Sequence, residues 1–230
     1  NITKKIELEV LSGDFKITKN SLKELVKKVG LIPITFDPIF KSVFGKNINL
    51  LKKFLNDVLF LELDIDGMDI KLLNTELPIE NIGEYRKRID IFIKINNDIY
   101  IDVEINRSNF ERVKLRNYLY GSKIYSMLLE SGHNIAELEN KFFIQLNLNT
   151  KERGRECGRE EITLYNMTKN EVYIKQEKIV LEYLEYYKKL YYTDKNELDV
   201  SGYWLAGLAS DSFYEMFDIL SNILDKEELT

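Results

Sequence analysis

The sequence predicts an α/β domain: a mixed β-sheet flanked by helices, with a helical extension at its C-terminal end. Three segments have the short apolar alternation of strands, at residues 69–77, 87–95 and 99–106. Residues 109–130 have the spacing of a long helix, and an apolar stretch at 142–148 indicates a further strand. Strands on both sides of one long helix are typical of helices packed on a sheet.

Before these strands, we expect a short alternating stretch and then a helix that ends near Gly30. A stronger helix start follows at Asp37-Pro38, because aspartate is a favoured N-cap and proline is favoured at the first helical position. A second helix is expected at about 49–61.

After residue 150 the sequence changes character. Residues 151–161 are charged and contain glycine, which indicates a loop. Short strands are expected at 161–165 and 172–174, and a helix carrying five tyrosines is expected from Glu177 to Tyr192.

The length suits one medium-sized domain with an appendage: a lead-in over 1–35, a core over 36–150, and a strand-and-helix extension over 151–230 that packs on the core. Hydrophobic residues make up 44% of the chain, which is ample material for a core. The single cysteine, Cys157, excludes an intrachain disulfide, and the single histidine, His133, excludes a multi-histidine metal site.

Charge and hydropathy narrow the function further. The net charge of −5 disfavours a protein that coats nucleic acid nonspecifically, but a nuclease needs only a local basic rim around its carboxylates. No apolar run approaches the roughly 18 residues that span a bilayer, and the first residues lack the apolar core of a signal peptide. We therefore expect a cytoplasmic protein without a membrane segment.

The hairpin formed by residues 87–95 and 99–106 carries the clearest chemical signal. Side chains alternate between the two faces of a strand, so Asp90 lies on the face opposite the isoleucines of the first strand. On the second strand, Glu104 and Asn106 lie on the face opposite the apolar residues, together with Asp102.

The loop of this hairpin determines which residues face each other. With the apolar faces aligned, a three-residue loop at Asn96–Asp98 places Asp90 opposite Glu104 and Arg88 opposite Asn106. Directly opposed Cβ atoms are roughly 4.5–5.5 Å apart, so two carboxylates there repel unless a cation or a proton lies between them. Mg²⁺ prefers such oxygen ligands and can polarise a phosphodiester. The alternative interpretation is the solvated face of an ordinary amphipathic hairpin.

Five short motifs occur in a fixed order. They are Phe36-Asp37-Pro38-Ile39-Phe40-Lys41-Ser42-Val43-Phe44-Gly45, Phe54-Leu55-Asn56-Asp57-Val58-Leu59, Asn74-Thr75-Glu76, Arg88-Ile89-Asp90-Ile91 and Asp102-Val103-Glu104-Ile105-Asn106. This set resembles the PD-(D/E)xK nuclease superfamily, and within it the recombination-promoting nucleases, also called PD-(D/E)xK nuclease family transposases. The resemblance covers about residues 33–150 and implies a restriction-endonuclease-like fold, metal-dependent DNA cleavage and a link to recombination and mobile DNA.

By this resemblance, Asp90 and Glu104 would be catalytic metal ligands for Mg²⁺ or Mn²⁺. Glu76 and the backbone carbonyl of Ile105 would complete the ligand set, although a solvated strand end also explains Glu76. Asp37 resembles a further acidic group of the site, but a helix cap is the favoured interpretation of that aspartate.

Asn106 occupies the position of the superfamily's catalytic lysine, where this family usually has glutamine. Asparagine keeps an amide that can orient a water molecule, but it cannot act as a cation on the phosphate. Candidates for that charge and for binding DNA phosphates are Arg88, Arg107, Arg112 and Arg116. The last two share one helix face, for which an ion-paired, solvated surface is the alternative interpretation.

Three functions follow from these observations. The first is a Mg²⁺- or Mn²⁺-dependent DNA endonuclease. The second, favoured by Asn106, is a catalytically weak or inactive nuclease-fold protein that binds DNA or a protein partner. The third is a structural dimerisation protein, since Trp204 and the tyrosine-rich helix either pack on the core or form a homodimer face.

Overall fold

The computed structural model describes residue 35 and residues 37–75, 90–96, 98–107, 110–128, 135–151 and 154–225. The predicted lead-in, apart from Thr35, lies outside these ranges. The chain divides into two compact units. Leu63–Tyr186 holds the sheet, and Asn1–Glu62 with Tyr187–Thr230 is helical in its described part.

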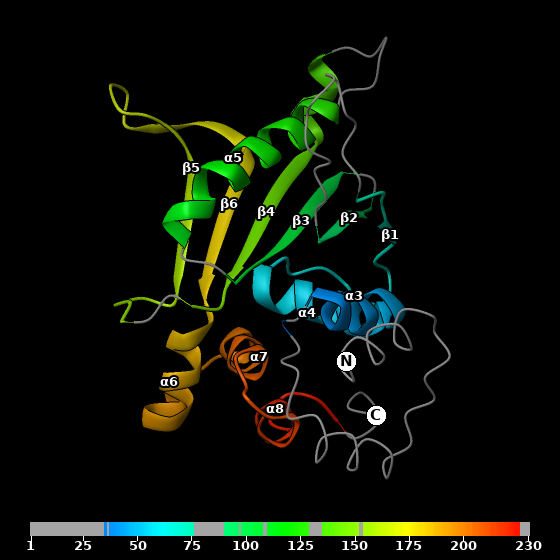
Figure 1. Cartoon of the computed structure of the whole chain (residues 1–230). Helices are drawn as coiled ribbons and strands as arrows, with labels where there is room; N and C mark the ends of the chain where they lie inside the picture. The colour runs from blue at the N-terminus through cyan, green and yellow to red at the C-terminus, as the bar shows by residue number, and fades with distance from the viewer. Residues whose placement is uncertain are drawn as a thin grey trace, which may run out of the picture. The chain divides into compact units, whose positions relative to one another are not determined.

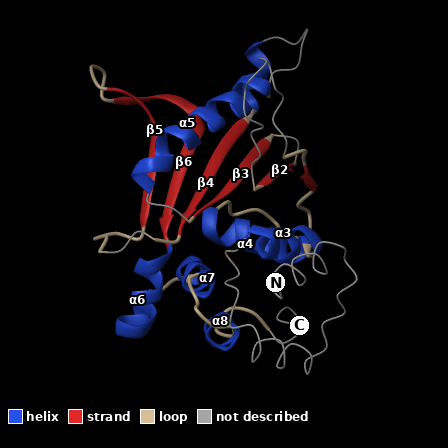
Figure 2. Cartoon of the chain, in the orientation of Figure 1, coloured by secondary structure: helices blue, strands red, loops and turns tan. Residues whose placement is uncertain are grey.

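Six described strands, β1 to β6, form one sheet (Figures 1 and 2). They span Ile70–Leu72, Ile91–Ile95, Ile99–Asn106, Phe142–Asn149, Arg159–Asn166 and Glu171–Tyr183. Their spatial order is β1-β2-β3-β4-β6-β5. β4 runs parallel to β3 and β6, and the other neighbours are antiparallel. The predicted mixed sheet is therefore confirmed, and residue 150 falls between two strands of it.

Two predicted elements differ most from the structure. The strand predicted at 69–77 covers only Ile70–Leu72, which pair with the last three residues of β2. The helix predicted from Glu177 to Tyr192 is wrong in its first part, because β6 continues to Tyr183 and α6 spans Leu184–Asp194. β6 pairs with β4 on one side and β5 on the other, and this tertiary pairing outweighs the local helical pattern.

Helix α5, Phe110–Met127, lies across one face of the sheet (Figure 1). Towards its C-terminal end, Ile124 packs with Tyr100 of β3 and Phe143 of β4 in a buried cluster. Further towards its N-terminal end, the buried Asn117 bonds to polar side chains of the same strands. The covered face therefore changes from apolar to polar along the strands, and its polar end holds the candidate site. The short η1, Ile135–Asn140, precedes β4.

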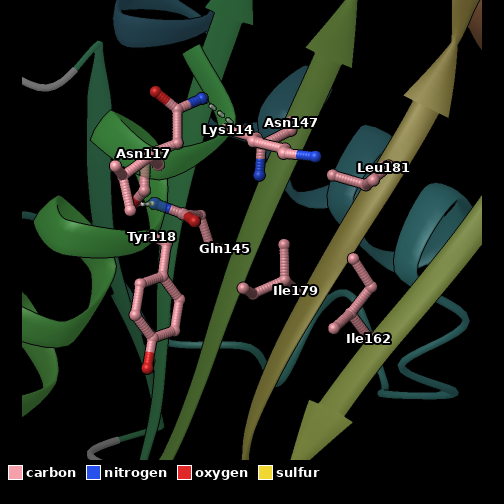
Figure 3. A pocket seen from close by; sticks show the side chains of 9 residues that line it. Lys114, Asn117, Tyr118, Gln145, Asn147, Ile162, Ile179 and Leu181 are labelled. Atoms are coloured by element: carbon pink, nitrogen blue, oxygen red, sulfur yellow. Dashed lines mark hydrogen bonds between the residues drawn. The ribbon is translucent and has the colours of Figure 1, made fainter. Parts of the chain in front are cut away.

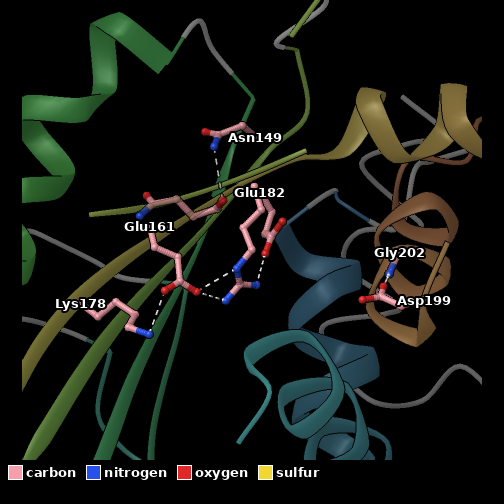
Figure 4. Close-up of polar contacts among 8 residues, drawn as sticks. Asn149, Glu161, Lys178, Glu182, Asp199 and Gly202 are labelled. Carbon is pink, nitrogen blue, oxygen red and sulfur yellow. Dashed lines mark hydrogen bonds and ion pairs between the residues drawn. The ribbon is translucent and has the colours of Figure 1, made fainter. Parts of the chain in front are cut away.

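An ion-pair network joins β5 to β6 (Figure 4). The Arg159 guanidinium donates to Glu182 at 2.5 Å and to Glu161 at 2.6 Å, and the Lys178 ammonium lies 2.9 Å from Glu161. Glu182 is fully buried, so Arg159 neutralises a carboxylate that would otherwise be costly to bury.

The helical unit has its own aromatic core. Its described helices are α3, Asp37–Lys46; α4, Ile48–Leu59; α7, Val200–Leu208; α8, Phe213–Leu220; the short η2, Lys195–Glu197; and most of α6. Phe54 and Trp204 are buried with their ring centroids 5.6 Å apart, and Trp204 Nε1 donates to Asp57 at 2.8 Å. Trp204 therefore packs inside this unit and is not a dimer face. In the ranges described above, no helix has the length and apolar character to cross a membrane.

Candidate active site

The β2–β3 hairpin has the register that the sequence predicts. Ile91 pairs with Val103, so Asp90, which directly precedes β2, lies across from Glu104. Two hydrogen bonds join Asp90 to Glu104 and to the next residue, Ile105. The amide of Ile105 donates to Oδ2 of Asp90 at 2.8 Å, and the amide of Asp90 donates to Oε1 of Glu104 at 3.4 Å. The structure therefore brings together the two acidic residues that the sequence selected.

The acidic face of β3 is buried. Asp102 is 0% exposed and Glu104 is 5% exposed, so the interpretation of this face as a solvated surface is wrong. Oδ2 of Asp102 accepts a hydrogen bond from Nε2 of Gln145 at 3.0 Å, and its Oδ1 has no partner among the described residues. Asp102 is thus a third acidic residue on this face, beside the predicted pair.

Burial and mutual repulsion raise the pKa values of these carboxyl groups. Burial, and then the carboxylates of Asp102 and Asp90, raise the pKa of Glu104 to about 9, while the positive charge of Arg116 opposes this rise. Burial raises the pKa of Asp102 to about 7, against the opposing hydrogen bond from Gln145. Without a cation, Glu104 therefore keeps its proton at neutral pH.

Asn106 belongs to a buried network of amide side chains. Its Nδ2 donates to Oδ1 of Asn147 at 3.2 Å and of Asn149 at 3.1 Å, and its Oδ1 accepts from Nδ2 of Asn117 at 3.0 Å. Asn117 also donates to Asn147 at 2.6 Å. Both amide hydrogens of Asn106 are therefore bound within the protein, which fixes this side chain between β3, β4 and α5.

Four amide side chains of the site were not among the residues predicted from the sequence. They are Asn117, Gln145, Asn147 and Asn149. Three of them occupy alternate positions of β4, between the apolar residues at 144, 146 and 148. Amides at every second position of a strand are the signal that could have indicated a polar layer under a helix.

Of the four predicted basic residues, Arg116 and Arg107 have described side chains. Arg116 lies near the acidic residues, where its charge acts on Glu104, and its Nε donates to Oδ1 of Asn117 at 3.1 Å. Arg107 directly follows β3 and is exposed. Arg112 belongs to α5, but the structure does not describe its side chain. Arg88 lies outside the described residues.

Two further predicted ligands have no described side chain. Glu76 lies outside the described residues. Asp37 begins α3, in agreement with a helix start at Asp37-Pro38, but its side chain is not described.

The donor set suits a hard divalent cation. Asp90 and Glu104 supply carboxylates from adjacent strand positions, and the high pKa of Glu104 reflects burial and negative charge that a cation would offset. In the part of the chain that is described, no group of three or more His, Cys, Asp or Glu side chains is arranged to hold a metal ion. Within the described ranges, a cation here would therefore bind the carboxylates of Asp90 and Glu104, and waters or phosphate oxygens would suit its other positions, as they commonly do for Mg²⁺.

Comparison with known proteins identifies the family. The family model described as PD-(D/E)XK nuclease family transposase matches residues 34–222. The chain belongs to this family, as the motifs predict, and its mixed sheet flanked by helices is consistent with a restriction-endonuclease-like α/β fold. Nucleases of this type generally use divalent metal ions. Comparisons with curated proteins and with solved structures gave no match.

In the absence of a divalent cation, we expect the stability of the protein to fall as the pH rises. The pKa values of Asp102 and Glu104 lie above their ordinary values of 3.8 and 4.5, so the folded state binds these protons more tightly than the unfolded state. This stabilisation is complete below about pH 4 and is lost as the pH passes through about 7 and about 9.

In EDTA, the melting temperature should therefore drop on the order of 5–10 °C between about pH 5 and pH 9. The measurement is thermal unfolding followed by circular dichroism. The double variant Asp102→Asn/Glu104→Gln should have a much flatter profile, and a profile as steep as that of the parent would contradict the assignment of the two pKa values.

Proposed function

We propose that this chain is a divalent-metal-dependent DNA endonuclease that hydrolyses phosphodiester bonds, with Asp90 and Glu104 as metal ligands. The observation that carries the proposal is this hydrogen-bonded pair of acidic residues, at which the pKa of Glu104 rises to about 9. A bound Mg²⁺ or Mn²⁺ would polarise the phosphate and lower the pKa of an attacking water. Membership in a nuclease family supports the reaction class.

The other residues have supporting roles in this proposal. The backbone carbonyl of Ile105 and the side chain of Glu76 complete the ligand set. Arg88, Arg107, Arg112 and Arg116 bind DNA phosphates. Asn106 is a positioning residue, because its amide holds side chains of β4 and α5 in place and leaves no N–H for a water.

A supercoiled plasmid tests the proposal directly. The protein should nick or linearise the plasmid with Mg²⁺ or Mn²⁺ and leave it intact with EDTA, and Asp90→Ala should lose this activity. Cleavage that persists in EDTA or in Asp90→Ala would mean that another site or a contaminating nuclease is responsible.

A second function is favoured by one observation. By the family resemblance, Asn106 takes the position of the catalytic lysine, and its amide is occupied by Asn147 and Asn149. A nuclease-fold protein without this cation is suited to binding DNA or a protein partner without cleaving it. This alternative predicts that Mg²⁺ or Mn²⁺ raises the melting temperature and that DNA binds, but that the plasmid stays intact.

A further inference from the structure

A pocket of about 290 Å³ lies between α5 and the strands β4, β6 and β5 (Figure 3). Most of its lining is apolar, and three amide side chains (Asn117, Gln145 and Asn147) and one lysine complete it. The lining includes Tyr118 and Lys114 of α5, Gln145 and Asn147 of β4, Ile179 and Leu181 of β6, and Ile162 of β5.

Two of these amide side chains, Gln145 and Asn147, each have one polar atom without a hydrogen-bond partner among the described residues. These atoms are Oε1 of Gln145, which is an acceptor, and Nδ2 of Asn147, which is a donor. Both residues are only 1% exposed. Buried polar atoms are nearly always paired in native proteins, so these two atoms require a partner, which a bound water or a ligand would supply.

The surrounding hydrogen bonds determine the orientation of both amides. Nε2 of Gln145 donates to the backbone carbonyl of Asn117 at 2.8 Å. Because a carbonyl oxygen can only accept, the atom at this position must be the amide nitrogen, and Oε1 is the unpartnered atom. Oδ1 of Asn147 accepts from the Nδ2 atoms of both Asn106 and Asn117, so Nδ2 is the atom left over. The wall of the pocket therefore holds one unpartnered acceptor and one unpartnered donor, two residues apart on the same face of β4 and almost fully covered.

We propose that this pocket binds a single unpaired nucleobase of the nucleic acid on which the proposed nuclease acts, so the inference rests on that proposed function. The Watson–Crick edge of every base has a donor next to an acceptor, which complements Asn147 Nδ2 and Gln145 Oε1. The flat faces of a base suit a lining of Ile179, Leu181 and the ring of Tyr118.

Size and charge agree with this ligand. A volume of about 290 Å³ is just below the roughly 300–1,000 Å³ of pockets for drug-sized ligands, so the pocket suits one base and not a duplex. Lys114 also lines the pocket, and its positive charge suits a phosphate of the same nucleotide.

The strand register places this pocket beside the acidic residues. In the parallel pair β3–β4, Gln145 is the partner of Asp102 and Asn147 is the partner of Glu104. A base bound to β4 would therefore hold its own nucleotide next to the carboxylates on β3. Because pairing hides the Watson–Crick edge in a duplex, the substrate must present an unpaired base, either in a single strand or as a nucleotide extruded from a duplex.

Binding in EDTA separates base recognition from cleavage. The full chain is titrated against a short, fluorescein-labelled single-stranded DNA, and against an abasic strand of equal length and charge, by fluorescence anisotropy. The strand with bases should bind roughly five- to a hundredfold more tightly. Equal affinities for the two strands would overturn the proposal.

Two matched variants locate the effect in the pocket. Ile162 and Leu164 are both on β5 and both 45% exposed, but only Ile162 lines the pocket. Ile162→Glu should abolish the preference for the strand with bases. Leu164→Glu should keep the preference, while its added negative charge weakens the binding of both DNA strands equally. The same loss of preference in both variants would overturn the proposal.

The two proposals can fail separately. A base preference that depends on Ile162 would support the pocket even if the plasmid is not cleaved under any metal condition. Metal-dependent cleavage without a base preference would overturn the pocket and leave the nuclease function standing.

Discussion

Glu104→Gln should abolish metal-dependent cleavage, lowering its rate about a thousandfold or more. Glutamine has the size of glutamate and keeps the Oε1 atom that accepts the amide hydrogen of Asp90, so the hairpin geometry is preserved. The substitution removes the carboxylate charge that would hold the cation. A metal ion supplies several kcal/mol of transition-state stabilisation, and roughly 1.4 kcal/mol corresponds to tenfold in rate.

A thermal shift checks this prediction independently of catalysis. In the parent, Mg²⁺ or Mn²⁺ should raise the melting temperature because the ion binds the folded state alone, and Glu104→Gln should lose most of this response. The matched control is Glu177→Gln on β6, a partly buried glutamate whose pKa is also raised by burial but which lies outside the acidic site. It should cleave like the parent. An unchanged metal response in Glu104→Gln would place the ion elsewhere.

The acidic pair could be predicted from the sequence because local rules determine it. The alternation of isoleucines assigns Asp90 and Glu104 to one face, and the length of the loop after Ile95 determines their pairing. Both rules involve residues close together in the chain. The predicted strand at 99–106 accordingly has the same bounds as β3.

The burial of this face could not be predicted, because it depends on α5 packing across the strands. A strand that is polar on one face has the same alternation whether water or a helix covers that face. The contact between Asn117 of α5 and Asn147 of β4 joins residues 30 positions apart. The extent of β6 was mispredicted for a similar reason, because residues near Val180 are held in a strand by pairing with both β4 and β5.

Asn106→Lys should raise the rate of plasmid cleavage roughly ten- to a hundredfold. The lysine ammonium can donate to the same Oδ1 atoms of Asn147 and Asn149 that now accept from the amide. Its charge would lie two residues from Glu104 on the same face of β3, where it favours the ionised carboxylate and stabilises the negative charge that develops on the phosphate.

Asn106→Met separates the effect of charge from the effect of side-chain length. Methionine is nearly as long as lysine but has no charge and cannot donate to Asn147 and Asn149. The side chains that Asn106 positions therefore lose these bonds, and this variant should cleave roughly ten- to a thousandfold more slowly than the parent. Both substitutions remove the acceptor used by Asn117, so the difference between them reports the cation together with its hydrogen bonds to Asn147 and Asn149. Thermal unfolding establishes that both variants are folded. If Asn106→Lys slows cleavage as much as Asn106→Met, the site does not use a cation at this position. If neither the variants nor the parent cleave while metal still binds, the nuclease-fold binding protein becomes the favoured function.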